Sequence, residues 1–235
     1  MKILAIDTSA NTSTVAVLEN DTLLGLFSAN IKNKHSEVLL PMVKNLLESL
    51  SLTNKDIDAY AVSQGPGSYT GIRIGAATIK GLAFQTGKDC VGVSTIEALA
   101  SNLEGFEGIV CPVMDARREQ VYAGAFLNGE RILSDQCILI NDLIPMLEGY
   151  NQPIYFCGDG YHLFENRQVA NMKKTPELLI YQNAFSVGKV AYKYLKKGQG
   201  VSDEALRVEY LLKVQAERER EERLKQNNDN GDTSK

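Results

Sequence analysis

The chain has 235 residues, with 25 Lys or Arg against 29 Asp or Glu, and a formal net charge of −4. This balance argues against strong autonomous binding to nucleic acid, which depends on many cationic contacts with phosphates. No apolar stretch approaches the roughly 20 residues that a membrane-spanning helix needs, and the four isolated cysteines predict buried thiols in a reducing cytoplasm.

The first half of the chain predicts three strands followed by alternating helices and strands. The strands are expected at Ile3–Asp7, Thr14–Leu18, Leu23–Phe27, Ala59–Val62 and Val91–Val93. The helices are expected at Ser36–Leu50, Ile72–Phe84 and Thr95–Leu103. Pro41 either kinks the first helix or marks its start near Leu40. Ser94 and Glu97 predict a capping box for the third helix.

The run GPGSYTGIRIG, residues 65–75, joins a predicted strand to a predicted helix. Gly65 and Gly67 permit a tight turn, and Ser68 and Thr70 can cap the helix. Helix N-termini favour anions, so the run predicts a strand–loop–helix that can face a phosphate. The alternative is a rigid loop that only connects two core elements. The spacing fits neither a Walker A loop nor G-x-G-x-x-G.

The second half repeats the plan of the first. Strands are expected at Ile109–Met114, which ends in Asp115, and at Gln120–Leu127, Arg131–Leu133 and Ile154–Cys157. Helices are expected at Asp142–Leu147, His162–Val169 and Ala184–Lys196. In each half, a turn Asn lies thirteen residues after the strand-ending Asp, at Asn20 and Asn128. The pattern predicts two lobes, each βββα with further β/α units.

Several segments resemble the TsaB (YeaZ) family, accessory proteins of bacterial tRNA threonylcarbamoyladenosine (t6A) synthesis. They are ILAIDTS (3–9), HSEVLLP (35–41), GPGSYTGIRIGAATIKGLA (65–83), GVSTIEALA (92–100) and DARREQVYAGAF (115–126). The resemblance implies an α/β, two-lobe actin/Hsp70/sugar-kinase-like ATPase fold in the cytoplasm. It implies an N-terminal lobe at 1–104, a C-terminal lobe at 105–204 and a helix at 205–225 that returns to the first lobe. Residues 226–235 are expected to be a disordered tail.

In the ATPases of this fold, two Asp-bearing turns face each other across a cleft that binds ATP and its metal. The corresponding candidates are Asp7, Thr8, Ser9, Gly65, Gly67, Ser68 and Asp115. Three features depart from that pattern. No glycine closely follows Asp7, Arg117 and Arg118 follow the second Asp, and Gly158-Asp159-Gly160 is a broken glycine pair. We therefore expect no catalytic residue and no required cofactor, with ATP or ADP and Mg²⁺ bound weakly at most. Both Asp residues are expected to cap turns.

A metal site is not expected. Only His35 and His162 are present, far apart, with no H-E-x-x-H. The related TsaD subunit carries a histidine pair on its first helix, where this chain has His35 followed by Ser36 and Glu37. We expect His35 to make a polar contact at the start of a helix.

The first two helices carry the predicted interface. Their apolar stripe suits the lobe's core, and the small residues of the second helix suit either its own sheet or another subunit. The resemblance implies that both helices form a homodimer surface that also docks TsaD. The predicted interface residues are His35, Glu37, Leu39, Leu40, Met42, Val43, Leu46, Gly71, Arg73, Gly75, Ala76 and Ile79.

The leading hypothesis is a non-catalytic scaffold that binds TsaD. TsaD would transfer threonylcarbamoyl to N6 of adenosine 37 in tRNAs that read codons starting with A. TsaE would supply the ATPase of the complex, tRNA would contact mainly TsaD, and the chain would form a homodimer when TsaD is absent. The first alternative is an ATPase or phosphotransferase that uses Asp7 and Asp115. A glycoprotease-like peptidase is the weaker alternative.

Overall fold

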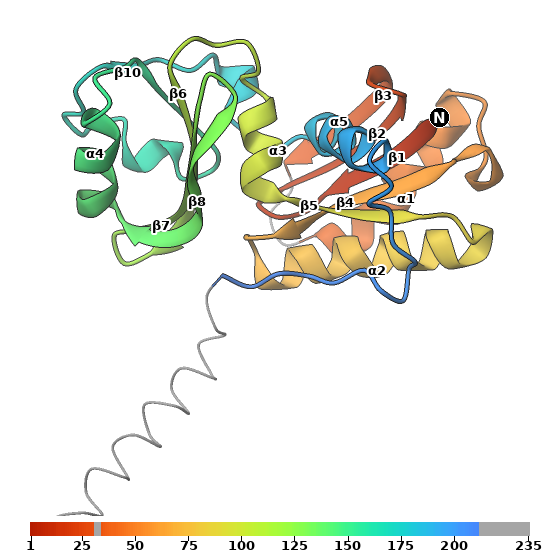
Figure 1. The fold of residues 1–235 in the computed structure, drawn as a ribbon. Helices are drawn as coiled ribbons and strands as arrows, with labels where there is room; N and C mark the ends of the chain where they lie inside the picture. The colour runs from red at the N-terminus through yellow and green to blue at the C-terminus, as the bar shows by residue number, and fades with distance from the viewer. Residues whose placement is uncertain (31–33, 212–235) are drawn as a thin grey trace, which may run out of the picture.

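The computed structural model describes residues 1–30 and 34–211, and these residues form two lobes, each built on a five-stranded sheet (Figure 1). We call them the first and second lobe in chain order. The predicted tail at 226–235, and the predicted helix beyond residue 211, lie outside the described residues. Within the described ranges, no helix combines the length and the apolar content needed to cross a bilayer.

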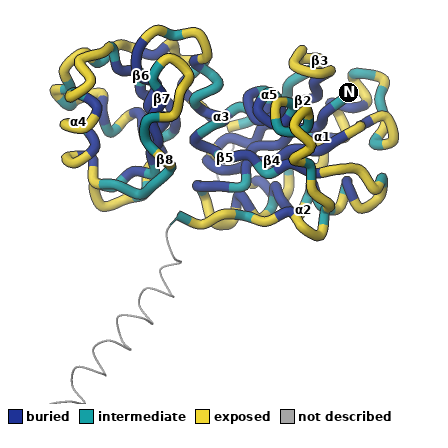
Figure 2. Tube along the Cα trace, viewed as in Figure 1, coloured by how far each residue is buried: buried dark blue, intermediate teal, exposed yellow. Residues whose placement is uncertain are grey.

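The first sheet has the order β3-β2-β1-β4-β5. Its strands are β1 (Lys2–Asp7), β2 (Thr12–Glu19), β3 (Thr22–Asn30), β4 (Ala59–Gly65) and β5 (Cys90–Ser94). The first three form an antiparallel meander, whereas β4 and β5 run parallel to β1. Alternate residues of β1 enter two different cores, because both faces of the sheet are covered. Figure 2 shows β4 and β5 mostly in the dark blue of buried residues.

Helices α1 (His35–Ser49) and α2 (Tyr69–Thr86) cover one face of the first sheet. Helix α1 runs through Pro41, so the predicted later start near Leu40 is wrong. Burial of Leu39, Val43 and Leu46 stabilises α1 on both sides of the proline.

Helix α5 (Ala184–Leu195) covers the opposite face of the first sheet, although the predicted boundaries assign it to the second lobe. Val187 and Val190 pack in one core with Ile3 and Ala5. The range 105–204 is therefore not one packing unit. Asn183 caps α5 by accepting from the Phe185 N–H at 2.9 Å.

The second sheet has the order β10-β9-β6-β7-β8, the same plan as the first. Its strands are β6 (Ile109–Arg117), β7 (Gln120–Leu127), β8 (Glu130–Leu139), β9 (Ile154–Cys157) and β10 (Met172–Lys173). Helix α4 (Ile140–Glu148) covers one face, and α3 (Thr95–Ser101) covers the other. Asn20 and Asn128 have φ of 58° and 49°, as their predicted tight turns require.

Two predicted helices are corrected. In place of a helix at 162–169 there is one 3-10 turn, η2 (Tyr161–Leu163), which suffices to bury Tyr161 and to stack Phe164 on Phe156 at 4.1 Å. Residues 206–211 are not helical either. Leu206 is buried in the first lobe's core, and the Glu209 N–H donates to Gln64 O at 2.7 Å. This contact holds the segment extended beside β4.

Two further 3-10 turns, η1 (Asn54–Asp56) and η3 (Glu177–Leu179), lie in connecting segments. The predicted capping box at α3 forms only in part. Ser94 Oγ accepts from the Glu97 N–H at 3.2 Å, but the Glu97 carboxylate bonds Tyr194 and Arg131.

Candidate functional site

Asp7 ends β1 and is fully enclosed by hydrogen-bond donors of its own lobe. Its Oδ1 accepts from the Ser9 N–H at 2.8 Å and from Ser9 Oγ at 2.7 Å. Its Oδ2 accepts from Ser63 Oγ at 2.5 Å. Ser63 was not predicted to belong to this site, because only the parallel pairing of β1 with β4 brings the two residues together.

Burial raises the pKa of the Asp7 carboxyl, against the opposing effect of the hydrogen bonds from Ser63 and Ser9. Asp7 is 1% exposed, and both of its oxygens are already engaged. Neither oxygen therefore faces solvent, from where the magnesium of a bound nucleotide would have to approach. The contacts of Asp7 are those of an acid that caps a turn.

His35 begins α1 beneath the same turn. It is buried, and its Nδ1 lies 2.6 Å from Ser13 Oγ. Burial lowers the pKa of His35, while a backbone hydrogen bond with Ala10 and the charge of Asp7 oppose this effect. The predicted polar contact at a helix start is confirmed, but the placement of His35 on an interface is corrected. No group of three or more His, Cys, Asp or Glu in the described part of the chain is arranged to hold a metal ion.

The glycines of the signature run let α2 pack directly on the turn after β1. A Cβ at Gly71 would lie 2.0 Å from Thr8 O, and one at Gly75 would lie 2.6 Å from Thr8 Oγ1. A Cβ at Gly67 would lie 2.5 Å from Ser9 O. Thr8 Oγ1 also donates to Gly71 O at 2.7 Å. The sequence allowed two interpretations of this run, a phosphate-facing loop or a rigid connection between core elements. This packing favours the rigid connection.

Gly65 and Ser68 complete this packing. Gly65 has a φ of +123°, and a Cβ there would lie 2.3 Å from Glu209 O. Ser68 is the N-cap of α2, and its Oγ accepts from the Gly71 N–H at 3.2 Å. Its own N–H donates to Ser9 O at 2.7 Å. The loop's polar groups thus bond to the protein itself.

The second Asp-bearing turn is built differently. Asp115 is exposed, and its Oδ1 accepts from the Arg117 N–H at 2.7 Å. Asp159 lies nearby and bonds Gln182 Nε2 through Oδ1 at 3.2 Å. Burial raises the pKa of Asp159 to about 6, and the charge of Asp115 adds to this rise. A Cβ at Gly158 would lie 2.1 Å from Val113 O, so this broken glycine pair packs on β6.

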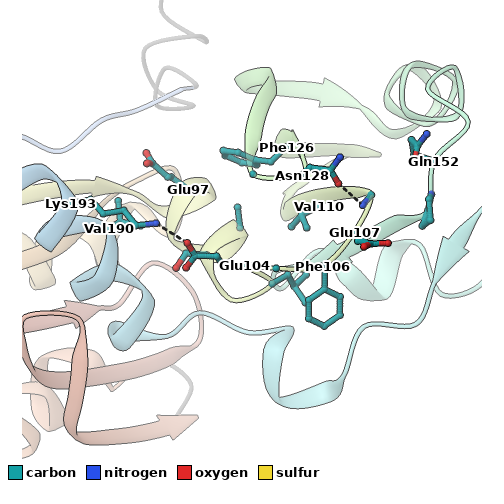
Figure 3. A pocket seen from close by; sticks show the side chains of 17 residues that line it. Glu97, Glu104, Phe106, Glu107, Val110, Phe126, Asn128, Gln152, Val190 and Lys193 are labelled. Carbon is teal, nitrogen blue, oxygen red and sulfur yellow. Dashed lines mark hydrogen bonds and ion pairs between the residues drawn. The ribbon is translucent and has the colours of Figure 1, made fainter.

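The predicted nucleotide residues do not line either of two cavities in the described part of the molecule. A cavity of about 660 Å³ lies beside α3, with Glu97, Glu104, Lys193 and Phe126 in its walls (Figure 3). A second, of about 470 Å³, lies in the second lobe around Asp159. Neither contains any of the seven predicted residues, from Asp7 to Asp115.

The structure divides the predicted interface residues into two groups. Those that face the first lobe's own core or turn are buried, and their assignment to an interface is corrected; they are His35, Leu39, Val43, Leu46, Gly71, Gly75, Ala76 and Ile79. Glu37, Leu40 and Arg73 are exposed, and Met42 is half-buried. Only these four keep side-chain surface for a partner.

Helices α1 and α2 lie side by side, and their exposed side chains together make up the solvent-facing surface of the pair. On α1, Leu40 is 55% exposed, and on α2, Phe84 is 79% exposed. We call this surface the docking face; it comprises Glu37, Leu40, Tyr69, Arg73, Ala77, Gly81 and Phe84. Phe84 was missed, although its helical spacing from Arg73, Ala77 and Gly81, opposite the buried stripe, was available in the sequence.

Arg73 is held by two tyrosines. Its guanidinium lies 3.8 Å from the centre of the Tyr69 ring, and its Nε donates to Tyr210 Oη at 2.6 Å. The two rings lie 5.2 Å apart. Tyr210, in the extended segment 206–211, thus adds to the docking face at the start of α2.

A family model and the sequences of known proteins agree on the kind of protein that this chain resembles. A family model described as TsaD, tRNA N6-adenosine threonylcarbamoyltransferase, matches residues 22–219. The chain is 39% identical over 162 residues to "tRNA threonylcarbamoyladenosine biosynthesis protein TsaB" of Bacillus subtilis. That match covers 67% of this chain and 71% of the relative.

Solved structures agree on the fold. A Pseudomonas aeruginosa protein described as similar to peptidase YeaZ has a TM-score of 0.76 and 27% identity, covering 90% of this chain and 99% of that one. The activator of 2-hydroxyisocaproyl-CoA dehydratase from Clostridium difficile has a TM-score of 0.50 at 9% identity, covering 89% and 100%. The second likeness concerns the fold alone. The predicted α/β two-lobe actin and sugar-kinase-like ATPase fold is confirmed.

Proposed function

This chain belongs to the TsaB (YeaZ) family, and we propose that it is a non-catalytic accessory subunit that binds TsaD through its docking face. Family membership supports a role in tRNA threonylcarbamoyladenosine biosynthesis. In the proposed complex, TsaD transfers threonylcarbamoyl to N6 of adenosine 37 and holds most of the tRNA. TsaE supplies the ATPase activity, and the complex works in the cytoplasm. Without TsaD, the same face pairs two copies of this chain.

One observation carries the non-catalytic role: the Asp7 turn is closed by groups of its own lobe. Ser9 and Ser63 engage both carboxylate oxygens, and α2 packs on the backbone of Thr8. An ATPase of this fold needs that carboxylate for the metal of the nucleotide. The closed turn therefore supports a scaffold rather than an ATPase or phosphotransferase.

The peptidase alternative has less support. Within the described residues, His35 is the histidine that contacts a serine, Ser13, and both side chains are buried. A nucleophile enclosed in this way cannot reach a peptide bond.

The docking face supplies the surface for a protein partner. Phe84 and Leu40 are large apolar side chains left exposed on neighbouring helices, and Tyr69 and Arg73 are of the residue types that dominate interface energies. Exposed apolar side chains and an Arg–Tyr cluster on neighbouring helices are typical of a protein interface.

Binding of purified TsaD to the full chain, measured by calorimetry, tests the proposal. We expect Phe84→Glu with Leu40→Glu to weaken binding about 30-fold or more, the loss of a hot spot worth about 2 kcal/mol. Leu178→Glu is the matched control, because Leu178 is 92% exposed on η3 of the second lobe, away from the docking face. It should bind as the unmodified chain does.

Undiminished binding by the docking-face variant, with both proteins folded, would reject this interface. The t6A content of tRNA from cells depleted of this chain tests the pathway separately. A normal t6A level after depletion would reject a role in that modification, whatever the interface.

A further inference from the structure

Helix α3 lies between the two lobes and packs on both. Ile96, Leu99 and Leu103 share one core with Val110 and Phe126 of the second sheet. On its other side, α3 contacts α5, which covers the first sheet. Lys189 of α5 pairs with Glu104, just after α3, at 2.6 Å. Lys193 of α5 pairs with the same carboxylate at 3.0 Å (Figure 3).

Glu97, near the start of α3, contacts both lobes at once. From the first-lobe side, Tyr194 Oη of α5 donates to Glu97 Oε2 at 2.6 Å. From the second-lobe side, Arg131 Nη2 of β8 lies 3.6 Å from the same oxygen. Arg131 also pairs with Asp135, which accepts a hydrogen bond from Ser94, the N-cap of α3. The carboxylate of Glu97 thus joins α5 to β8.

Asn102, at the other end of α3, repeats this arrangement. Its Nδ2 donates to Leu179 O at 3.1 Å and to Tyr181 O at 2.9 Å, in the segment that ends the second lobe. Its Oδ1 accepts from Ser186 Oγ of α5. A short helix therefore carries, at each end, one polar side chain that bonds both lobes.

We propose that Glu97 and Asn102 are lobe-positioning residues that hold the two lobes at one fixed angle. Kinases and other two-lobe proteins close around a ligand by hinge or shear motion of their lobes. Rotation here would have to break hydrogen bonds at both ends of α3 and shear a shared apolar core. The chain therefore keeps one lobe arrangement with or without a nucleotide. This property goes beyond the proposed function and does not depend on a partner.

Distances between spin labels in the isolated full chain test this rigidity. Labels on p-acetylphenylalanine introduced at Asp21 and Met146, which are exposed on different lobes, leave the four cysteines untouched. Pulsed electron paramagnetic resonance should give one narrow distance distribution, unchanged by ATP and Mg²⁺. Glu97→Ala with Asn102→Ala should abolish the narrow distribution and give a broad one.

The matched control is Glu119→Ala, which removes an ion pair with Arg167 that lies wholly within the second lobe. It should leave the distribution narrow. If the double variant does not fold, the single variants Glu97→Gln and Asn102→Asp test the proposal instead. Each keeps a side chain of similar size and should still broaden the distance distribution.

A broad distribution in the unmodified chain would overturn the proposal. So would a shift on adding ATP and Mg²⁺, or folded variants as narrow as the unmodified chain. Because TsaD takes no part in these measurements, their failure is separate from failure of the proposed interface.

Discussion

The two lobes share one strand order, but the aspartates that end their first strands lie in opposite environments. In the first lobe, Asp7 is buried under three hydrogen bonds, and the 18-residue helix α2 follows β4. In the second lobe, Asp115 is exposed, and only the three-residue turn η2 follows β9. A duplicated backbone plan therefore does not fix the environment of the residues it repeats. The helix that packs on the turn determines that environment.

The lobes also exchange their last helices. Helix α3 ends the first βββαβαβα unit but covers the second sheet, and α5 ends the second unit but covers the first sheet. This exchange places α3 and α5 in contact between the lobes. It explains why a boundary drawn along the sequence does not separate two packing units.

We expect the largest difference between the lobes in the free energy of unfolding that is lost when each carboxylate is removed. Asp7→Ala leaves three buried donors of Ser9 and Ser63 without an acceptor, and should lower the free energy of unfolding by about 4 kcal/mol. Asp115→Ala removes one exposed turn contact and should cost less than about 1 kcal/mol. Urea unfolding measures both. Equal losses would contradict the contrast.

Two glycines of α2 test whether the signature run serves packing. Gly71→Ala would place a Cβ 2.0 Å from Thr8 O, and should lower the free energy of unfolding by about 3 kcal/mol. At Gly81 a Cβ meets nothing within 4 Å. Gly81→Ala should therefore raise that free energy by about 1 kcal/mol, through helix propensity. If both variants are stabilised, as urea unfolding would show, α2 does not pack closely on the turn.

A carboxyl of the second lobe, Asp159, should make the stability of the protein depend on pH. Burial raises the folded-state pKa of Asp159 from 3.8 to about 6. The stability contributed by its protonated form is fully present below pH 3.8 and is lost as the pH rises to about 6. The loss should be about 3 kcal/mol. Asp159→Asn imitates the neutral form and keeps an oxygen for Gln182, so it should remove this fall.

Urea unfolding of both proteins at pH 4, 5, 6 and 7 isolates the effect, because the Asp7 contribution is common to both. A parallel dependence on pH in the variant and the unmodified chain would show that Asp159 does not titrate in this range.

Much of the secondary structure was predictable because its signals are local. The predicted bounds of Gln120–Leu127 and Ile154–Cys157 agree with β7 and β9, where apolar runs end at turn residues. The helix caps at Ser68 and Ser94 were also predictable, because a cap bonds a backbone group three residues away. The weak helix predicted at 162–169 lacked such a cap, and its confirmed part is a single turn.

Eight of the twelve predicted interface residues are buried, for one physical reason. An amphipathic helix shows in its sequence that one side is apolar, but not whether the lobe's own sheet or a second subunit covers that side. Leu39, Val43 and Leu46 face the core of their own lobe, whereas the exposed Phe84 was not among the predicted interface residues.

By itself, the sequence determined most of the strand and helix order, the turns at Asn20 and Asn128, and the glycines that the tight loop requires. These depend on residues a few positions apart. Only the tertiary structure decided that Ser63 bonds Asp7, that Thr8 fills the space beside Gly71, and that α3 and α5 cover each other's sheets. Those contacts join residues 56 to 63 positions apart, or helices to distant sheets, because strand pairing and burial bring them together.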